Sequence, residues 1–513
     1  MSKAVGIDLG TTNSVVAYTS TTGVTQVLTG AEGFRIVPSV IYFDQSDGST
    51  IVGERALQFA VLEPARCARL FKRGMGEQTF LDNGSEFVVD GKVWRPEELS
   101  SLVLKKLKLM AEQSLGESVK DAVITVPAYF GEPERSATRV AGELAGFNVL
   151  RILSEPTAAA IAHGFERSTR NANLLVFDLG GGTFDVTLMH VDGEGEMNVL
   201  FSGGDRRLGG ADFDNLILSR IAREVDAACG VDITEDPYNL FAAQQAAEEV
   251  KKELSSRTTA QRPIQTGRKP FMFSITRSDF NEMIDDKLVF MRDTIEMTIQ
   301  NAGIAASNIS MVLMVGGSSR IPVLQQILQE ITGREPTFSS NLDEDVAIGA
   351  SILATKMHEP LQANSAIDLL PMPIDAASHG LGVTVLVDGQ GAELQNSILI
   401  RPGSPLPAQG LAQLVTVVNG QSAVELVLNE GDEENLDYVR VLGRQTGEFS
   451  SPRPAGYPLE ARISYDLDQL ITAEIYDGNS GERLCFVRVR SDGGMTEGQK
   501  ALAQTTISGQ EVQ

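Results

Sequence analysis

Asp178-Leu179-Gly180-Gly181-Gly182-Thr183-Phe184-Asp185 stands between two runs of apolar residues. Residues 174–177 and 186–191 both predict buried strands, which places the glycines in the turn of a hairpin. Three adjacent glycines allow backbone N–H groups to line a concave turn that binds anions. Because Mg²⁺ prefers oxygen ligands and nucleotide phosphates, the two flanking aspartates indicate a Mg²⁺–nucleotide site.

A second stretch near the N-terminus repeats this pattern. Val5-Gly6-Ile7-Asp8-Leu9-Gly10-Thr11-Thr12-Asn13-Ser14-Val15-Val16 again gives an apolar strand, Asp-Leu-Gly, small turn residues and another apolar strand. Two such hairpins could clamp one polyphosphate from both sides. The dinucleotide-binding fingerprint and the P-loop both require a helix directly after the glycines. A strand follows here, so the sequence argues against both motifs.

Composition and charge narrow the class of protein. The 513 residues are enough for two to four domains, and 42% hydrophobic content supports full-sized cores. No apolar run approaches the length of a membrane span, and the first strand begins too early for a signal peptide. A formal net charge of −25 argues against nonspecific binding to nucleic acid or membrane surfaces. The three widely spaced cysteines and four scattered histidines predict no disulfide framework or metal cluster, which favours a reducing cytoplasm.

Hydrophobic periodicity divides the chain into an α/β part and an all-β part. Helices are expected at 54–62, 97–115, 132–146, 241–254 and 344–357. Residues 381–490 consist of short alternating runs and turns, which predict a β-sandwich. We therefore expect domains at 1–360 and 374–494, a linker at 361–373, and a short polar tail at 495–513 with room for at most one helix.

Other stretches can be explained either by a role at the nucleotide site or by an ordinary structural role. Lys72 is either a solvated surface charge or a group of the phosphate site. Glu155 precedes an alanine-rich helix and either caps it or faces the cleft. The side chains of Glu248, Lys251 or Lys252, and Ser255 share one helix face, as an exposed ion pair or as a polar wall for a nucleoside.

Six ordered segments resemble one family. These segments are residues 6–14, 126–130, 155–160, 178–185, 208–214 and 316–322. From Gly6 to about Gly498 the chain resembles the 70-kDa heat-shock (DnaK-like) chaperones. The resemblance implies an actin-like (heat-shock/hexokinase type) ATPase domain of four subdomains, followed by an all-β sandwich that binds extended apolar peptide segments under the control of ATP hydrolysis.

The resemblance also implies site residues for ATP or ADP with Mg²⁺, and K⁺ is a further candidate ion. Lys72 would lie beside the γ-phosphate and the attacking water, with Thr183 and Asp185 nearby. Asp8, Glu155 and Asp178 would hold hydrated Mg²⁺. The nucleotide would be bound by Gly10, Thr11, Thr12, Asn13, Gly180, Gly181, Gly182, Thr183, Gly209, Gly210, Glu248, Lys251, Lys252, Ser255, Gly316, Gly317, Ser318, Arg320 and Asp343.

Positions outside the nucleotide site match the coupling machinery of the family. Pro127 and Arg135 match the nucleotide-state switch, and Arg151 matches the position that meets a J-domain co-chaperone. The linker residues Asp368, Leu369 and Leu370, which include two leucines unusual for a solvated linker, are expected to dock on the ATPase domain in one nucleotide state. A nucleotide exchange factor is a further candidate partner. The peptide-pocket candidates, for which ordinary sandwich core is an equal alternative, are Val383, Leu386, Leu414, Val417 and Val424.

The chain also departs from the family pattern. No helical lid is expected after the sandwich, which resembles the lid-poor (HscC-like) branch. Pro371 and Pro373 interrupt the linker, Leu342 replaces a usual proline, and Ser154 replaces a usual asparagine. Two alternatives to a chaperone remain at this point: an actin-family kinase for a small molecule, and a regulatory ATP-binding protein without coupled refolding.

Overall fold

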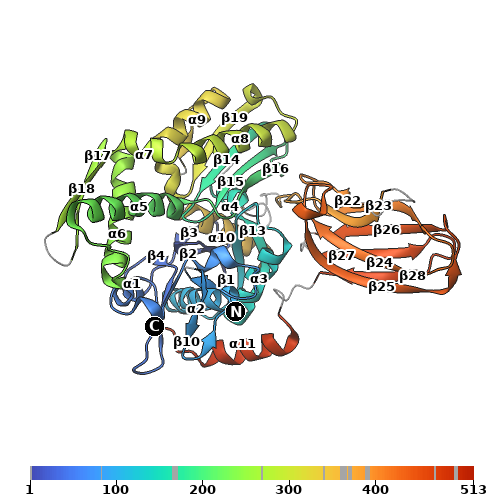
Figure 1. The fold of residues 1–513 in the computed structure, drawn as a ribbon, viewed down its shortest axis with the longest axis horizontal. Coiled ribbons are helices and arrows are strands. Elements are labelled where there is room, and N and C mark those ends of the chain that lie inside the picture. The colour runs from blue at the N-terminus through green and yellow to red at the C-terminus, as the bar shows by residue number, and fades with distance from the viewer. Residues whose placement is uncertain are drawn as a thin grey trace.

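The computed structural model describes residues 3–82, 84–163, 171–266, 270–338, 341–358, 367, 372–387, 393–466, 470–489 and 495–513. Residues 3–358 form a two-lobed α/β body, and residues 381–488 form a β-sandwich beside it (Figure 1). This is the fold class that the sequence predicts. None of the described helices combines the length and apolar character needed to span a membrane.

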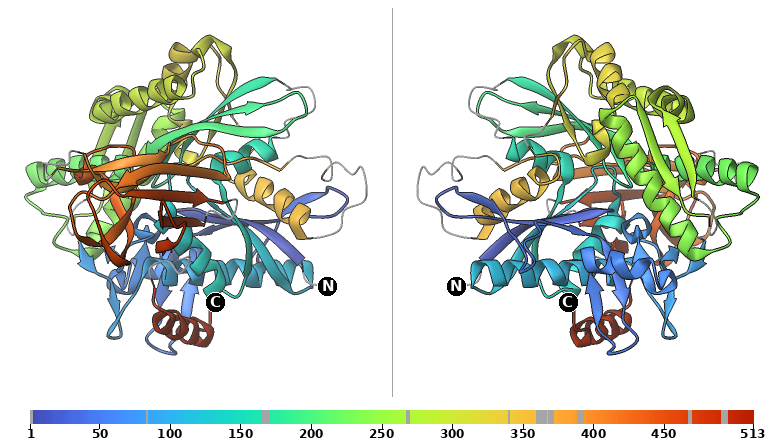
Figure 2. Two further views of the ribbon diagram at one scale, coloured as in Figure 1. Left: turned by 90° about the vertical axis from the view of Figure 1, so that its right-hand side faces the viewer. Right: turned by 90° about the vertical axis from the view of Figure 1, so that its left-hand side faces the viewer.

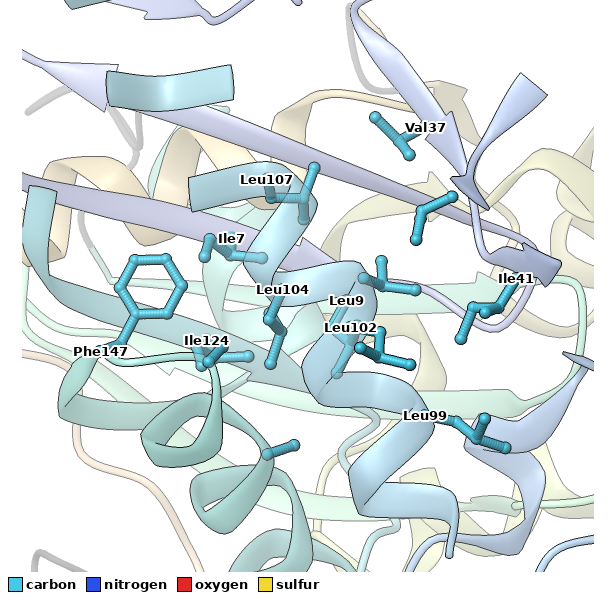
Figure 3. Packing of buried hydrophobic residues seen from close by; sticks show 14 of the residues in the cluster. Ile7, Leu9, Val37, Ile41, Leu99, Leu102, Leu104, Leu107, Ile124 and Phe147 are labelled. Atoms are coloured by element: carbon cyan, nitrogen blue, oxygen red, sulfur yellow. The ribbon is translucent and has the colours of Figure 1, made fainter. Parts of the chain in front are cut away.

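The first lobe is built on a mixed sheet in the order β13-β12-β1-β2-β3, with β4 paired to β2. Its strands are β1 (Lys3–Leu9), β2 (Asn13–Thr19), β3 (Thr25–Val27), β4 (Ile36–Pro38), β12 (Val119–Val126) and β13 (Asn148–Ser154). Helices α2 (Pro96–Leu115) and α3 (Glu132–Leu144) pack on one face. Figure 3 shows Leu104 and Leu107 of α2 beside Ile7 and Ile124 of the sheet. The helical spacing of apolar residues in 97–115 correctly predicts this packing.

The second lobe repeats the plan with a sheet in the order β16-β15-β14-β19-β20. Its strands are β14 (Ala172–Leu179), β15 (Phe184–Val191), β16 (Met197–Asp205), β19 (Ile309–Val315) and β20 (Thr337–Phe338). Helices α5 (Gly210–Cys229), α6 (Pro237–Ser256), α7 (Arg277–Met283), α8 (Asp285–Asn301) and α9 (Pro322–Thr332) contribute to the core beside this sheet.

Two helices pack between the lobes. Helix α4 (Glu155–Ala162) and helix α10 (Asp345–His358) share a buried cluster with strands of both sheets. They approach so closely that a Cβ atom added at Gly349 would lie 1.8 Å from the carbonyl oxygen of Ala158. The alanine-rich sequence of α4 permits this contact, because larger side chains would separate the two helices.

Smaller elements surround the cleft between the lobes. A three-stranded sheet consists of β5 (Val40–Phe43), β6 (Thr50–Val52) and β7 (Cys67–Arg69), and α1 (Glu54–Ala60) packs against it. Short hairpins are formed by β8 (Leu81–Asp82) with β9 (Ser85–Glu86), β10 (Val88–Val89) with β11 (Lys92–Val93), and β17 (Thr259–Ile264) with β18 (Phe271–Thr276).

The sandwich contains two four-stranded antiparallel sheets in the orders β22-β21-β24-β25 and β23-β26-β27-β28. The strands are β21 (Leu381–Leu386), β22 (Leu394–Ile400), β23 (Ala408–Val415), β24 (Gln421–Glu430), β25 (Arg440–Arg453), β26 (Pro458–Tyr465), β27 (Ile471–Asp477) and β28 (Arg483–Arg488). The sequence predicts six of them, whereas β22 and β25 are missed. Most residues of these two strands are at least partly exposed to solvent, and apolar and polar residues do not alternate regularly in them. The hydrophobic pattern of the sequence therefore does not predict either strand.

The segment before the sandwich joins the second lobe. Ile374 pairs in parallel with Asn198 at the free edge of β16, where its N–H donates to Met197 O at 2.9 Å. The expected docking residues Asp368, Leu369 and Leu370 lie outside the described residues. The expectation that these residues dock therefore stays a prediction, and the observed contact with the second lobe is made by Ile374, directly after Pro373.

The last residues form one helix, as the sequence allows, but this helix is not a free polar tail. Helix α11 (Glu497–Gly509) lies beneath the first lobe, as Figures 1 and 2 show from different sides. Ala503 and Ile507, four residues apart, are buried, and Lys500 pairs with Glu143 of α3 at 2.7 Å. Gln513 donates its N–H to Thr50 O at the edge of β6. A sparse apolar stripe is thus enough to dock an otherwise polar segment.

Candidate functional site

The two glycine turns predicted to face each other do meet. A Cβ atom added at Gly181 would lie 1.8 Å from Thr12 Oγ1, and one at Gly182 would lie 2.5 Å from Thr11 Cγ2. The first turn is held by Ser39, whose Oγ donates to Gly10 O at 2.8 Å. Only glycine allows the two hairpins to approach this closely, so residues 10–12 and 180–183 form the two sides of one cradle.

Two further glycine turns complete the cradle. The N–H of Gly210, at the start of α5, donates to Gly180 O at 3.0 Å. Gly316 follows β19 with a φ of 80°, and a Cβ atom there would lie 2.5 Å from Asp178 Oδ1. Gly209 packs equally closely on Gly182, and Ser318 lies beside Gly210. All four predicted glycine turns therefore converge at the cleft between the lobes.

Buried carboxylates lie beneath the cradle. Asp178 and Asp185 are direct partners on β14 and β15, and Asp8 near the end of β1 accepts a hydrogen bond from Thr125 Oγ1 at 3.1 Å. Lys72 is only 2% exposed and pairs with Glu155 at 2.7 Å. It belongs to a short 3-10 turn at Phe71–Gly74 that follows Leu70, which has a φ of 56°. Lys72 is therefore not a surface charge.

Burial and repulsion from neighbouring charges raise the pKa values of the three aspartates. Burial, then the charge of Glu155, raises the pKa of Asp8 to about 7 and that of Asp185 to about 7. The same two causes, in the same order, raise the pKa of Asp178 well above its usual range. Lys72 opposes all three shifts. One lysine does not neutralise four carboxylates, so the site fits an additional cation.

The carboxylates of this centre are the kind of oxygen ligands that Mg²⁺ and its water molecules prefer. In the described part of the chain, no three Asp, Glu, His or Cys side chains are placed to hold one metal ion between them. Mg²⁺ loses its water reluctantly and usually keeps several water ligands. Asp8, Glu155 and Asp178 would thus hold Mg²⁺ through its water molecules, and the ion would supply positive charge beside the phosphates.

An open cleft of about 1090 Å³ extends from the cradle toward α6 and is lined by Thr12, Gly181, Glu248 and Lys251 among others. Lys251 Nζ donates to Asp214 Oδ2 at 2.7 Å and to Gly210 O at 3.0 Å, which ties α6 to α5. The cleft is large enough for a nucleoside.

The other predicted nucleoside contacts are more peripheral. Lys252 forms an exposed i,i+4 ion pair with Glu248 at 2.7 Å. For this residue the structure shows the ion pair that the sequence offered as the alternative to a nucleoside contact. Ser255 Oγ bonds within its own helix to Lys251 O at 3.4 Å. Arg320 and Asp343 form an exposed ion pair at 3.6 Å.

Sequence analysis missed two residues of the site. The guanidinium of Arg73 contacts Gly182 O at 3.3 Å and forms an ion pair with Asp212, which joins the Lys72 turn to two glycine turns. The N–H of Tyr129 donates to Asp185 Oδ1 at 2.8 Å. Tyr129 lies within a segment that carries the family resemblance and Arg73 directly follows Lys72, but the partner of each is more than 50 positions away in the sequence.

The predicted coupling residues lie where the body meets the sandwich. Arg135 of α3 donates to Phe130 O at 2.9 Å and to Ser378 Oγ at 3.3 Å. Arg151 of β13 pairs with Asp375 at 2.8 Å and donates to Pro373 O at 3.3 Å. Pro127 begins the loop that ends at Gly131. Arg151 is thus buried against the segment before the sandwich in this arrangement.

The peptide-pocket candidates separate into two groups. Val383 is 2% exposed and belongs to the sandwich core, and Leu414 and Val424 pack against that core. Leu386 and Val417 are 40% and 37% exposed. These two residues lie at the same end of the sandwich, because β24 runs antiparallel to β21.

A two-lobed body whose glycine turns close over a buried carboxylate–lysine centre, joined to a β-sandwich, defines an actin-like ATPase with an attached binding domain. Comparison with known proteins agrees. A model of the family described as "Hsp70 protein" matches residues 4–483. The chain is 38% identical over 492 residues to the chaperone protein DnaK from each of two strains of Thermus thermophilus, covering 91% of this chain and 77% of each relative. The protein belongs to the Hsp70 family of ATP-dependent chaperones.

Proposed function

We propose that ATP hydrolysis between the two lobes controls the binding of apolar peptide segments at the far end of the sandwich. The observation that carries this proposal is the loop from Pro127 to Gly131. On one side the N–H of Tyr129 bonds to Asp185 of the catalytic centre, and on the other Tyr129 O accepts a bond from His379 Nε2 at 3.1 Å. A shift of the sandwich is thereby transmitted to a catalytic carboxylate.

A second contact supports the same coupling. Ile374 extends the sheet that carries Asp178 and Asp185, because β16 pairs with β15 and β15 with β14. The Arg151–Asp375 pair fastens the same segment to the first lobe. We propose that residues 372–375 act as the docking linker and that undocking changes the position of β16 and β15.

For hydrolysis, we assign the phosphates to the cradle of N–H groups at residues 10–12 and 180–183. Lys72 stabilises negative charge that develops on the γ-phosphoryl group, and Asp185, held by Tyr129, orients the attacking water. Positioning and charge neutralisation of this kind supply most of the catalysis in phosphoryl transfer. Asp8, Glu155 and Asp178 hold the hydrated Mg²⁺ that balances the phosphate charge.

The peptide site is proposed at the end of the sandwich remote from the linker. Exposed apolar side chains gather there on neighbouring strands and their connections, and an apolar surface of this kind is typical of an interaction site. These side chains are Leu386, Val387, Leu394, Val415, Val417 and Val418. Leu386 and Leu394 are direct partners across β21 and β22.

We also propose a J-domain co-chaperone and a nucleotide exchange factor as partners, on the basis of family membership. Because Arg151 is covered by the linker here, a J-domain that contacts it would sense the docked state. A cytoplasmic location is consistent with three free cysteines, two of them buried.

The test combines two measurements on the full chain. Steady-state ATPase should rise when an apolar peptide is added, and ATP should speed the release of a fluorescent apolar peptide. Ile374→Pro removes the N–H that donates to Met197, so it should abolish both responses while ATP still binds. Coupling through this segment would be disproved if the variant responds to peptide and ATP as the parent does.

A further inference from the structure

At the interface between the body and the sandwich, the carboxylate of Glu430 bonds to the backbone of a second glutamate, Glu132. Glu430 ends β24 of the sandwich, and its Oε1 accepts the N–H of Glu132, the first residue of α3, at 2.9 Å. The residue before this helix is Gly131, which has no side chain to cap it. A Cβ atom at Gly131 would lie 2.5 Å from Glu430 Oε2. The sandwich thus supplies the helix cap that the body lacks.

This cap has an electrostatic cost. Glu132 is 4% exposed, and no cation is paired with it at salt-bridge distance among the described residues. Burial, then the charge of Glu430, raises the pKa of Glu132 well above its usual range, with Glu134 adding to the shift and Arg135 and Arg139 opposing it. Burial beside a second negative charge favours the neutral form of a carboxyl group, so charge on both glutamates carries a penalty.

The charged groups around Glu430 do not remove the penalty. Burial raises the pKa of Glu430, and Glu134 adds to this shift, while His379, Arg440 and the N–H of Glu132 oppose it. Arg440 is already paired with Glu134 at 2.8 Å, and His379 lies beside Asp432 at 3.9 Å. The helix N–H stabilises the charged form of Glu430, whereas burial and the charge of Glu430 favour the neutral form of Glu132.

We propose that Glu132 and Glu430 form a proton-binding contact between the domains, so that acid favours the docked arrangement and alkaline solution releases the sandwich. Glu430 then acts as a positioning residue for the loop from Pro127 to Gly131. The same loop carries Tyr129, which holds Asp185, and Phe130, whose ring lies 5.7 Å from Lys72 Nζ. The effect on hydrolysis rests on the coupling proposed above, whereas the effect on docking does not.

The direction of the pH effect follows from the pKa shifts. Both glutamates have raised pKa values in the docked state and ordinary ones near 4.5 once separated in water. Docking therefore takes up protons. It is strongest below the ordinary glutamate range and weakens as the pH rises toward the docked pKa. Each pH unit across this window lowers the docking constant by up to about tenfold for each proton taken up.

Small-angle X-ray scattering of the full chain tests this inference without using ATPase activity. The radius of gyration is measured from acid to mildly alkaline pH at constant ionic strength, with a non-hydrolysable ATP analogue present throughout. The parent should expand as the pH rises. Glu132→Gln and Glu430→Gln keep the size of each side chain and the acceptor oxygen but remove one titrating carboxyl group each. Each variant should weaken the pH dependence of the radius, and the double variant should flatten it.

Glu425→Gln is the matched control, because Glu425 is an exposed residue of the same strand β24. It should expand with pH as the parent does. The two variants lie in different domains, so a folding defect in one of them does not remove the test. Circular dichroism checks that each variant is folded. The inference is overturned if the parent keeps one radius across the range, or if a folded Gln variant retains the parent's pH profile. A pH-dependent radius without peptide-stimulated ATPase would instead refute the proposed function and leave the proton contact intact.

Discussion

Replacement of Lys72 by alanine tests the catalytic centre most directly. Lys72 opposes the raised pKa values of all three aspartates, Asp8, Asp178 and Asp185, and it pairs with Glu155 at 2.7 Å. It does not line the open cleft that extends toward α6. Its removal should therefore affect the charge that develops in the transition state more than the binding of the nucleoside.

The expected loss follows from the size of comparable effects. Removing one preorganised electrostatic stabiliser typically lowers kcat by about 10²–10³, or roughly 2.7–4 kcal/mol of transition-state stabilisation. Because Lys72 and Glu155 are both buried, the variant also leaves a carboxylate without its partner. We expect at least about a hundredfold slower hydrolysis with a nearly unchanged dissociation constant for ATP.

Single-turnover hydrolysis of a preformed ATP complex measures the chemical step, and equilibrium titration with a fluorescent ATP analogue measures binding. Lys287→Ala serves as control, since Lys287 pairs with exposed Asp286 at 3.1 Å on α8, far along the chain from the cradle. The control should match the parent in both assays. A Lys72→Ala protein that hydrolyses bound ATP at the parent rate would refute the assignment of Lys72.

The remaining predictions concern binding and coupling. Gly316→Ala places a Cβ atom 2.5 Å from Asp178 Oδ1 at a φ of 80°, so calorimetry should show strongly weakened ATP binding, whereas Gly333→Ala, with φ 66° and open space, should leave binding intact despite backbone strain. Arg151→Ala leaves buried Asp375 unpaired; removing one partner of a buried pair typically costs about 3–5 kcal/mol, and ATP-triggered peptide release should disappear. Leu386→Asp should weaken apolar peptide binding in fluorescence anisotropy by at least about tenfold, with ATPase unchanged without peptide, and equal affinity would exclude that end of the sandwich.

The convergence of the glycine turns is predictable from sequence because its requirements are local. Each glycine turn needs small residues directly after an apolar strand, and this pattern is visible without knowledge of the partner turn. The strand pairing of Asp178 with Asp185 also follows from the short hairpin between them. The same applies to α2, whose apolar spacing gives a regular buried face.

The contacts that connect the domains are not local and are therefore missed. The N–H groups of Tyr129 and Glu132 reach their partners, Asp185 and Glu430, only in the folded chain. Neither side of these contacts has a distinctive spacing or composition. The docking prediction for Leu369 and Leu370 rests on their apolar character and lies outside the described residues. The pairing of Ile374 depends on the free edge of β16, which no local sequence pattern reveals.

Two physical connections therefore run between the sandwich and the catalytic centre, and they differ in kind. The linker connection is a backbone extension of the sheet through β16 and β15, which depends little on side-chain identity. The loop connection through Tyr129 and Glu132 depends on particular carboxyl groups and on their protonation. Since both reach Asp185 from different elements, a change in either one alters the geometry around the same carboxylate. Linker coupling therefore depends on the backbone of the sheet, whereas the pH dependence proposed here requires the carboxyl groups of Glu132 and Glu430.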